Sequence, residues 1–172
     1  EGGLSLYQTE WNSPGFLSVP QFNAESLTQA VDPSDGGRAR RAVLSGRYAL
    51  PLSDGSHLQV TGWGMASDYS IFLHIPGHSH DGASGTVVQS GEWDERLGAG
   101  GRVEYGRVWD RGDLTLGLSG RADQVDYAHA ATFRREILNP EIDLAATHRA
   151  GALYGRWRQR VGDRLALDLG GR

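Results

Sequence analysis

Apolar and polar side chains alternate along most of this chain, and this period is typical of a β-strand whose two faces meet different surroundings. Over residues 41–52, one face carries Ala42, Leu44 and Tyr48, and the other carries charged and small side chains. The same alternation recurs over residues 92–107. Helical periodicity is rare by comparison. The pattern therefore predicts an all-β chain built from amphipathic strands.

The alternating runs are long. They extend over roughly 12 to 16 residues in the clearest cases, whereas a strand of a globular protein usually has ~5–6. Because consecutive runs are joined in chain order, we expect an antiparallel meander of about seven strands. The predicted strands are 3–12, 41–52, 57–69, 91–107, 113–125, 146–160 and 164–172.

The predicted connections alternate between short and long. Short turns are expected at 53–56, 108–112 and 162–163, and loops of about twenty residues or more at 13–40, 70–90 and 126–145. Short turns at one end of a sheet and long loops at the other are typical of outer-membrane β-barrels. The chain is therefore predicted to form a segment of a transmembrane β-barrel.

Charged and aromatic side chains favour the same interpretation. A charged strand face suits a wet barrel lumen better than a dry core. The residues assigned to that face are Arg41, Arg47, Arg96, Arg102, Glu104, Arg121, Arg156 and Arg158. Aromatic residues near the strand ends predict interfacial girdles. They are Tyr7, Trp11, Tyr48, Tyr69, Trp93, Tyr105, Trp109 and Trp157.

The composition of the chain excludes several kinds of chemistry and partner. The 172 residues include 25 Gly and no Cys, and their formal net charge is -4. The absence of Cys excludes disulfides and thiolate chemistry. Mild acidity argues against a nucleic-acid partner. No run approaches the ~18 apolar residues of a membrane helix. Alternation that is still running at Arg172 predicts that the chain is a portion of a longer one.

Several short motifs, in their linear order, resemble the TonB-dependent outer-membrane receptors, in the middle portion of their barrel. The similarity lies in segments 32–41, 44–48, 51–55, 100–105, 153–156 and 161–165. The resemblance implies residues 1–172 as a partial β-barrel domain without a plug domain. It implies energy-coupled uptake of a scarce ligand, most often a ferric siderophore or another metal chelate, across the bacterial outer membrane.

The resemblance also implies partners. These are outer-membrane lipid and lipopolysaccharide, the metal-chelate ligand, and TonB only through the missing plug region. No cofactor and no enzymatic activity are expected, because the chain has no Gly-x-Ser-x-Gly, phosphate-loop or His-Glu-x-x-His motif.

Two groups of residues are candidates for ligand binding. Arg41, Arg47, Arg96 and Arg102 could bind oxygen atoms of an anionic chelate, since guanidinium groups match such oxygens in a bidentate manner. Their alternative role is pairing with acidic side chains of neighbouring strands or the plug. In a predicted loop, His78, His80 and Asp81 could hold a metal ion. The alternative there is a polar turn-forming loop that happens to contain His.

Two further interpretations stay open. A complete eight-stranded barrel with a structural or adhesive role fits the length, although seven runs and a terminal Arg172 do not match an even strand number and a C-terminal aromatic residue. A soluble β-sandwich binding protein would also alternate, and solubility without detergent would identify it.

Overall fold

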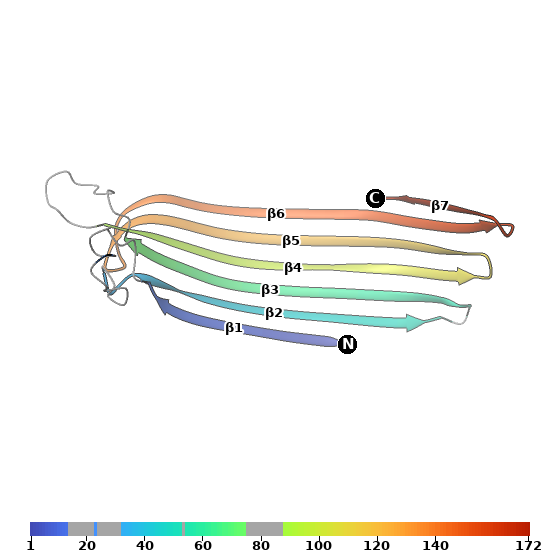
Figure 1. Ribbon diagram of the computed structural model, residues 1–172, viewed down its shortest axis with the longest axis horizontal. Helices are drawn as coiled ribbons and strands as arrows, with labels where there is room; N and C mark the ends of the chain where they lie inside the picture. The colour runs from blue at the N-terminus through green and yellow to red at the C-terminus, as the bar shows by residue number, and fades with distance from the viewer. Residues whose placement is uncertain (14–22, 24–31, 53, 75–87) are drawn as a thin grey trace.

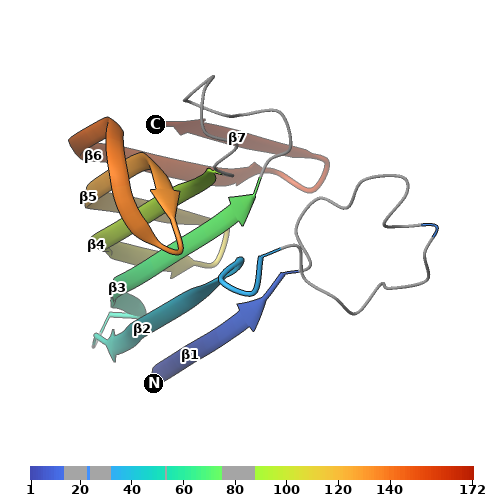
Figure 2. The same ribbon diagram turned by 90° about the vertical axis from the view of Figure 1, so that its left-hand side faces the viewer.

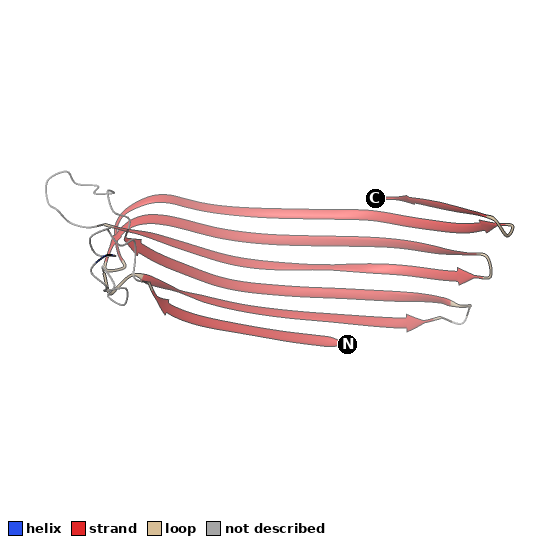
Figure 3. Cartoon of the chain, viewed as in Figure 1, coloured by secondary structure: helices blue, strands red, loops and turns tan. Residues whose placement is uncertain are grey.

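A computed structural model describes residues 1–13, 23, 32–52, 54–74 and 88–172. This part of the chain forms seven β-strands in one sheet (Figures 1 and 3). The prediction of an all-β chain with seven strands is confirmed. The strands are β1 (Gly2–Asn12), β2 (Gly36–Pro51), β3 (Ser56–His74), β4 (Gln89–Trp109), β5 (Gly112–Phe133), β6 (Glu136–Val161) and β7 (Leu165–Gly171).

The sheet is an antiparallel meander in which each strand pairs with its neighbours in sequence. In the described part, β1 and β7 do not pair with each other, so the sheet is open and not closed into a barrel (Figure 2). Because β7 pairs only with Gly155–Val161, β6 is unpaired on that side over residues 136–154. No helix in the described residues is both long and apolar enough to span a membrane.

Direct cross-strand partners point to the same side of a sheet, so the register defines two faces. Partners such as Leu58 and Tyr105 define the apolar face. Partners such as Thr61 and Arg102 define the polar face. Only four hydrophobic residues of the described part are buried, whereas Leu44, Leu118, Leu153 and many others are exposed. Within the part of the chain that the structure describes, no second layer covers the apolar face, and the sheet has no core of the usual kind.

The apolar face carries a continuous strip of apolar and small side chains. It covers residues 58–66 of β3, 97–105 of β4 and 114–122 of β5, about 27 Å along each strand at ~3.4 Å per residue. Its polar border runs straight across β1 to β4, where Gln8, Arg40, Asp68 and Glu95 are direct partners in turn. The border then shifts by two residues on β5, where Gln124 pairs with Leu97, and by two more on β6, where Arg149 pairs with Ala122. The strip is therefore oblique to the strands over β4 to β6.

The prediction of a loop over residues 126–145 is wrong. Residues 126–145 form the far part of the β5–β6 hairpin, which turns at Arg134 and Arg135, both with positive φ (48° and 70°). The alternation weakens here because this part of the hairpin lies beyond the apolar strip, where neither face needs to be apolar. In Figure 2 the hairpin bends over neighbouring strands. The other two predicted loops are shorter than expected, since β2 begins at Gly36, β3 ends at His74 and β4 begins at Gln89.

Aromatic girdles require side chains on the apolar face near both ends of the strands. Only some of the predicted girdle residues lie there. By the register, Tyr48, Tyr105, Trp109 and Trp157 lie on the apolar face, towards the end of the sheet that holds the Asp54 turn. Trp93 lies on the same face at the other end, where its ring makes an edge contact with Phe72 at 5.3 Å. The residues placed on the polar face instead are Tyr7, Trp11 and Tyr69.

The β2–β3 turn is closed by a carboxylate. The backbone N–H of Ser56 donates to Asp54 Oδ1 at 3.2 Å, and the Ser56 hydroxyl donates to the same oxygen. These bonds favour the ionised form, so they lower the pKa of Asp54 below 3.8. Gly55 supplies the positive φ (79°) that the turn requires.

We therefore expect the stabilisation from Asp54 to be complete above the ordinary carboxyl pKa and to disappear as the pH falls through its lowered value. An NMR titration of the Asp54 carboxyl carbon should show this low pKa, and Ser56→Ala should move it back towards 3.8. An unchanged titration in Ser56→Ala would contradict the assignment.

Candidate functional site

The four arginines predicted to bind an anionic ligand lie on the polar face, in two pairs. Ser67 of β3 pairs with both Arg41 and Arg96, and Thr61 pairs with both Arg47 and Arg102. Members of a pair are thus two strands apart, ~10 Å at ~4.8 Å per strand. The two pairs are separated by six residues along β2, or about 20 Å. The structure therefore brings the arginines together two by two and not as one cluster.

Two of these arginines already have partners. The guanidinium of Arg96 forms a bidentate ion pair with Asp94, with 2.6 Å between Nε and Oδ1. Arg47 donates from Nη2 to Gln59 Oε1 at 2.6 Å. For Arg96 this is the alternative role, pairing with an acidic neighbour. Within the described residues, Arg41 and Arg102 have no ion-pair partner, so they are the better candidates for an external anion.

The remaining charges of the polar face are largely paired. Asp123 Oδ2 accepts a hydrogen bond from Arg121 Nε and lies 3.7 Å from His148 Nδ1. Asp168 Oδ1 lies 3.0 Å from Arg156 Nε, and its Oδ2 lies 3.4 Å from Arg158 Nη2. These acidic residues were not predicted as site members. The sequence could have suggested that Arg121 pairs with Asp123, because residues two apart on a strand lie on the same face. Contacts between strands, such as Asp123 with His148, cannot be predicted without knowing which residues are cross-strand partners.

Arg102 borders a hollow of about 580 Å³ on the polar face. Trp63 forms part of its wall, and the guanidinium of Arg121 lies 5.7 Å from the centre of the Trp63 ring. Small side chains such as Ser119 and Ala150 leave the hollow open. The guanidinium of Arg102, unpaired among the described residues, can bind an anionic group in this hollow through charge-assisted hydrogen bonds.

Glycines on the polar face make room for the large side chains directly opposite them. A Cβ atom added to Gly100 would lie 2.9 Å from the Trp63 ring. At Gly117 it would lie 2.1 Å from the ring of Tyr154, whose hydroxyl donates to Glu104 Oε2 at 3.0 Å. These glycines therefore determine where the side chains of the candidate site lie.

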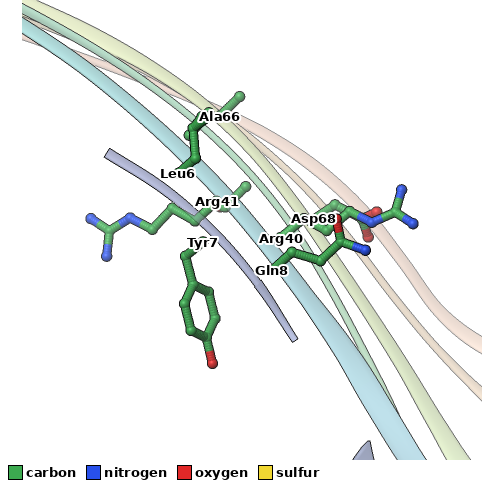
Figure 4. A pocket seen from close by; sticks show the side chains of 9 residues that line it. Leu6, Tyr7, Gln8, Arg40, Arg41, Ala66 and Asp68 are labelled. Carbon is green, nitrogen blue, oxygen red and sulfur yellow. The ribbon is translucent and has the colours of Figure 1, made fainter. Parts of the chain in front are cut away.

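The surroundings of Arg41 are different. Residues from β1, β2 and β3 surround a hollow here, but Figure 4 shows that its side chains leave the sheet on two sides. Tyr7 and Arg41 project to one side, and Gln8, Arg40 and Asp68 project to the other. Arg41 is consequently an isolated cation on the polar face, without the enclosing walls found around Arg102.

A buried polar cluster holds the sheet together at the Arg134 end. Asp35 is fully buried, and its Oδ1 accepts from the backbone N–H of His74 at 3.0 Å and from Gln89 Nε2 at 2.7 Å. Arg135 donates from its backbone N–H to Gln89 Oε1 at 3.1 Å and from Nε to the carbonyl of Ser34 at 2.8 Å. This cluster ties the β5–β6 hairpin to the start of β2.

The predicted metal ligands His78, His80 and Asp81 lie outside the described residues, so this prediction stays untested. Across the described ranges, no group of three or more His, Cys, Asp or Glu side chains could hold a metal ion.

Comparison with protein-family models, with curated proteins and with solved structures finds no match to this chain. The resemblance seen in the sequence therefore depends on the motifs alone.

Substitution of a glycine tests whether it makes room for the large side chain opposite it on the polar face. Gly117→Ala should displace Tyr154 from Glu104 and destabilise the folded protein by about 1–3 kcal/mol, the usual cost of overpacking. The matched control is Gly151→Ala, where the nearest atom to an added Cβ is 3.6 Å away and we expect no loss. Chemical unfolding of both variants measures the difference, and equal stabilities would contradict the packing described here.

Proposed function

We propose that this chain is part of the wall of a transmembrane β-barrel, with the apolar face towards lipid and the polar face towards a water-filled lumen. The observation that carries the proposal is the exposed apolar strip, whose length on β3, β4 and β5 is about 27 Å. Strands of outer-membrane barrels are tilted by ~35–45° and carry an apolar band about 25 Å tall. A strip about 27 Å long on strands tilted by 40° is about 21 Å tall. A bilayer would also cut tilted strands at shifted positions, and the polar border shifts in this way from β4 to β6.

The exposure of the strip argues against a soluble sheet. Leu44, Leu118 and Leu153 are 63%, 55% and 74% exposed, and soluble monomers rarely expose a contiguous apolar patch larger than a few hundred Å². The open edges of β1 and β6 fit the same proposal, because further strands of a barrel would pair with them.

Within this wall we propose the function that the resemblance implies, energy-coupled import of an anionic metal chelate by a TonB-dependent receptor of the bacterial outer membrane. Arg102, beside Trp63, is the side chain best placed to contact such a ligand from the lumen. Arg41 and Arg47 would add positive charge on the same face. The plug and the contact with TonB would be supplied by other parts of the receptor.

One substitution on each face tests the membrane assignment. In phospholipid vesicles, Leu118→Arg should cost about 2–4 kcal/mol of the free energy of unfolding, because it places a cation at mid-depth on the lipid face. Ser45→Arg adds the same charge to the polar face, where its direct partners are Gly3 and Trp63, and should cost less than about 1 kcal/mol. Denaturant titration of the protein that carries this chain measures both. Since Leu118 is 55% exposed, a soluble sheet would tolerate both changes, and that result would contradict the proposal.

The import function is tested with ferric citrate as an anionic probe. Uptake of radioactive iron by energised cells that produce the protein should fall about tenfold in Arg102→Gln, the loss expected for one charge-assisted hydrogen bond. Arg158→Gln is the matched control, because Arg158 pairs with Asp168. Equal uptake by both variants would reject Arg102 as a ligand contact, and absence of uptake by the unaltered protein would reject ferric citrate transport.

A further inference from the structure

Six glycines form a continuous row across the apolar face. Each is the direct cross-strand partner of the next, from β1 to β6, so the row runs perpendicular to the strands for about 24 Å. Its members are Gly2, Gly46, Gly62, Gly101, Gly120 and Gly151.

Packing within the chain does not explain most of this row. A Cβ atom added at Gly46, Gly62 or Gly120 would find its nearest neighbour at 3.9–4.0 Å, which is ordinary van der Waals contact. Only Gly101 is restricted, by the carbonyl oxygen of Thr61 at 2.9 Å. Glycine within a strand is destabilising by roughly 0.5–1 kcal/mol relative to alanine. The missing side chains therefore leave space for something outside the chain.

A hollow lies beside this row on the same face, since Gly64, Ala99 and Ala122 of its lining are each two residues from a glycine of the row. This hollow, of about 550 Å³, has small apolar residues across β2 to β5, and Leu4, Leu44 and Leu97 surround them. The small residues are Ala42, Gly64, Ala66, Ala99 and Ala122. Together, the glycine row and the hollow form a shallow apolar depression.

A cation lies at the border of this depression. Arg149 of β6 lines the hollow with Gln124 and Thr147, pairs directly with Ala122, and is two residues from Gly151 on the same face. Among the described residues Arg149 has no ion-pair partner. An unpaired guanidinium next to apolar space is complementary to a molecule with a phosphate at one end and a hydrocarbon chain at the other.

We propose that this depression binds one anionic phospholipid of the surrounding bilayer, with an acyl chain against the small residues and the phosphate at Arg149. The inference rests on the proposed function in one respect, that the apolar face contacts lipid. It adds that one part of this face retains a particular lipid, and that the charge of the head group matters.

The test uses the purified protein that carries this chain, equilibrated in vesicles of equal parts phosphatidylglycerol and phosphatidylcholine. After transfer to mild detergent, native mass spectrometry counts the retained lipid. Gly64→Val fills the hollow, and it should fold because an added Cβ has 4.0 Å to its nearest neighbour. Leu169→Phe is the control, since it adds apolar volume on the same face but outside the depression.

We expect the unaltered protein and Leu169→Phe to retain one phosphatidylglycerol, and Gly64→Val to retain about tenfold less of either lipid. Arg149→Gln should keep lipid but lose the preference for phosphatidylglycerol. Unchanged retention in Gly64→Val, or an unchanged preference in Arg149→Gln, would overturn the lipid site while the membrane assignment stands. A protein that does not enter the vesicles at all would overturn both.

Discussion

The membrane assignment of this sheet depends on one constraint, which is that no described residue outside the sheet covers its apolar face. In the described residues, Leu6, Leu44, Leu118 and Leu153 lie between 55% and 74% exposed, each on a strand that pairs with at least one neighbour at that position. Backbone hydrogen bonds between strands hold the sheet, but they do not remove apolar surface from water. In the function proposed above, a bilayer supplies the apolar environment for this face without a second protein layer.

The polar face follows from the same constraint. A face that meets water can carry charges at little cost, provided that most of them have partners. Asp94, Asp123 and Asp168 each pair with an arginine on their own or the adjacent strand. Arg102 differs from these paired arginines, because it has no ion-pair partner in the described residues. It lines an open hollow together with Trp63. Any anion that enters from the polar side would meet this arginine without having to displace an existing ion pair.

Strand positions and faces could be predicted from the sequence because period-two alternation reports directly which side chains share a face. Arg41, Arg47, Arg96 and Arg102 consequently lie on the predicted face. Prediction failed over 126–145, where apolar residues such as Ile142 and Leu144 are mixed with polar ones and two register shifts interrupt the alternation, although the hairpin ladder continues to Phe133 and Glu136. Cross-strand relations, such as Asp123 with His148 and the row of six glycines, depend on register, which single-strand periodicity does not contain.

The membrane assignment requires that the apolar face of the sheet contacts lipid and the polar face contacts water. Spin labels along β4 test it most directly, because they report the environment of each face. Because the chain has no Cys, nitroxide labels can be attached at single cysteines introduced at residues 97–105 in vesicles. Power saturation compares their accessibility to dissolved oxygen and to a water-soluble nickel complex. Oxygen should dominate at odd positions and nickel at even ones. Equal exposure of both faces to the nickel complex would contradict the account.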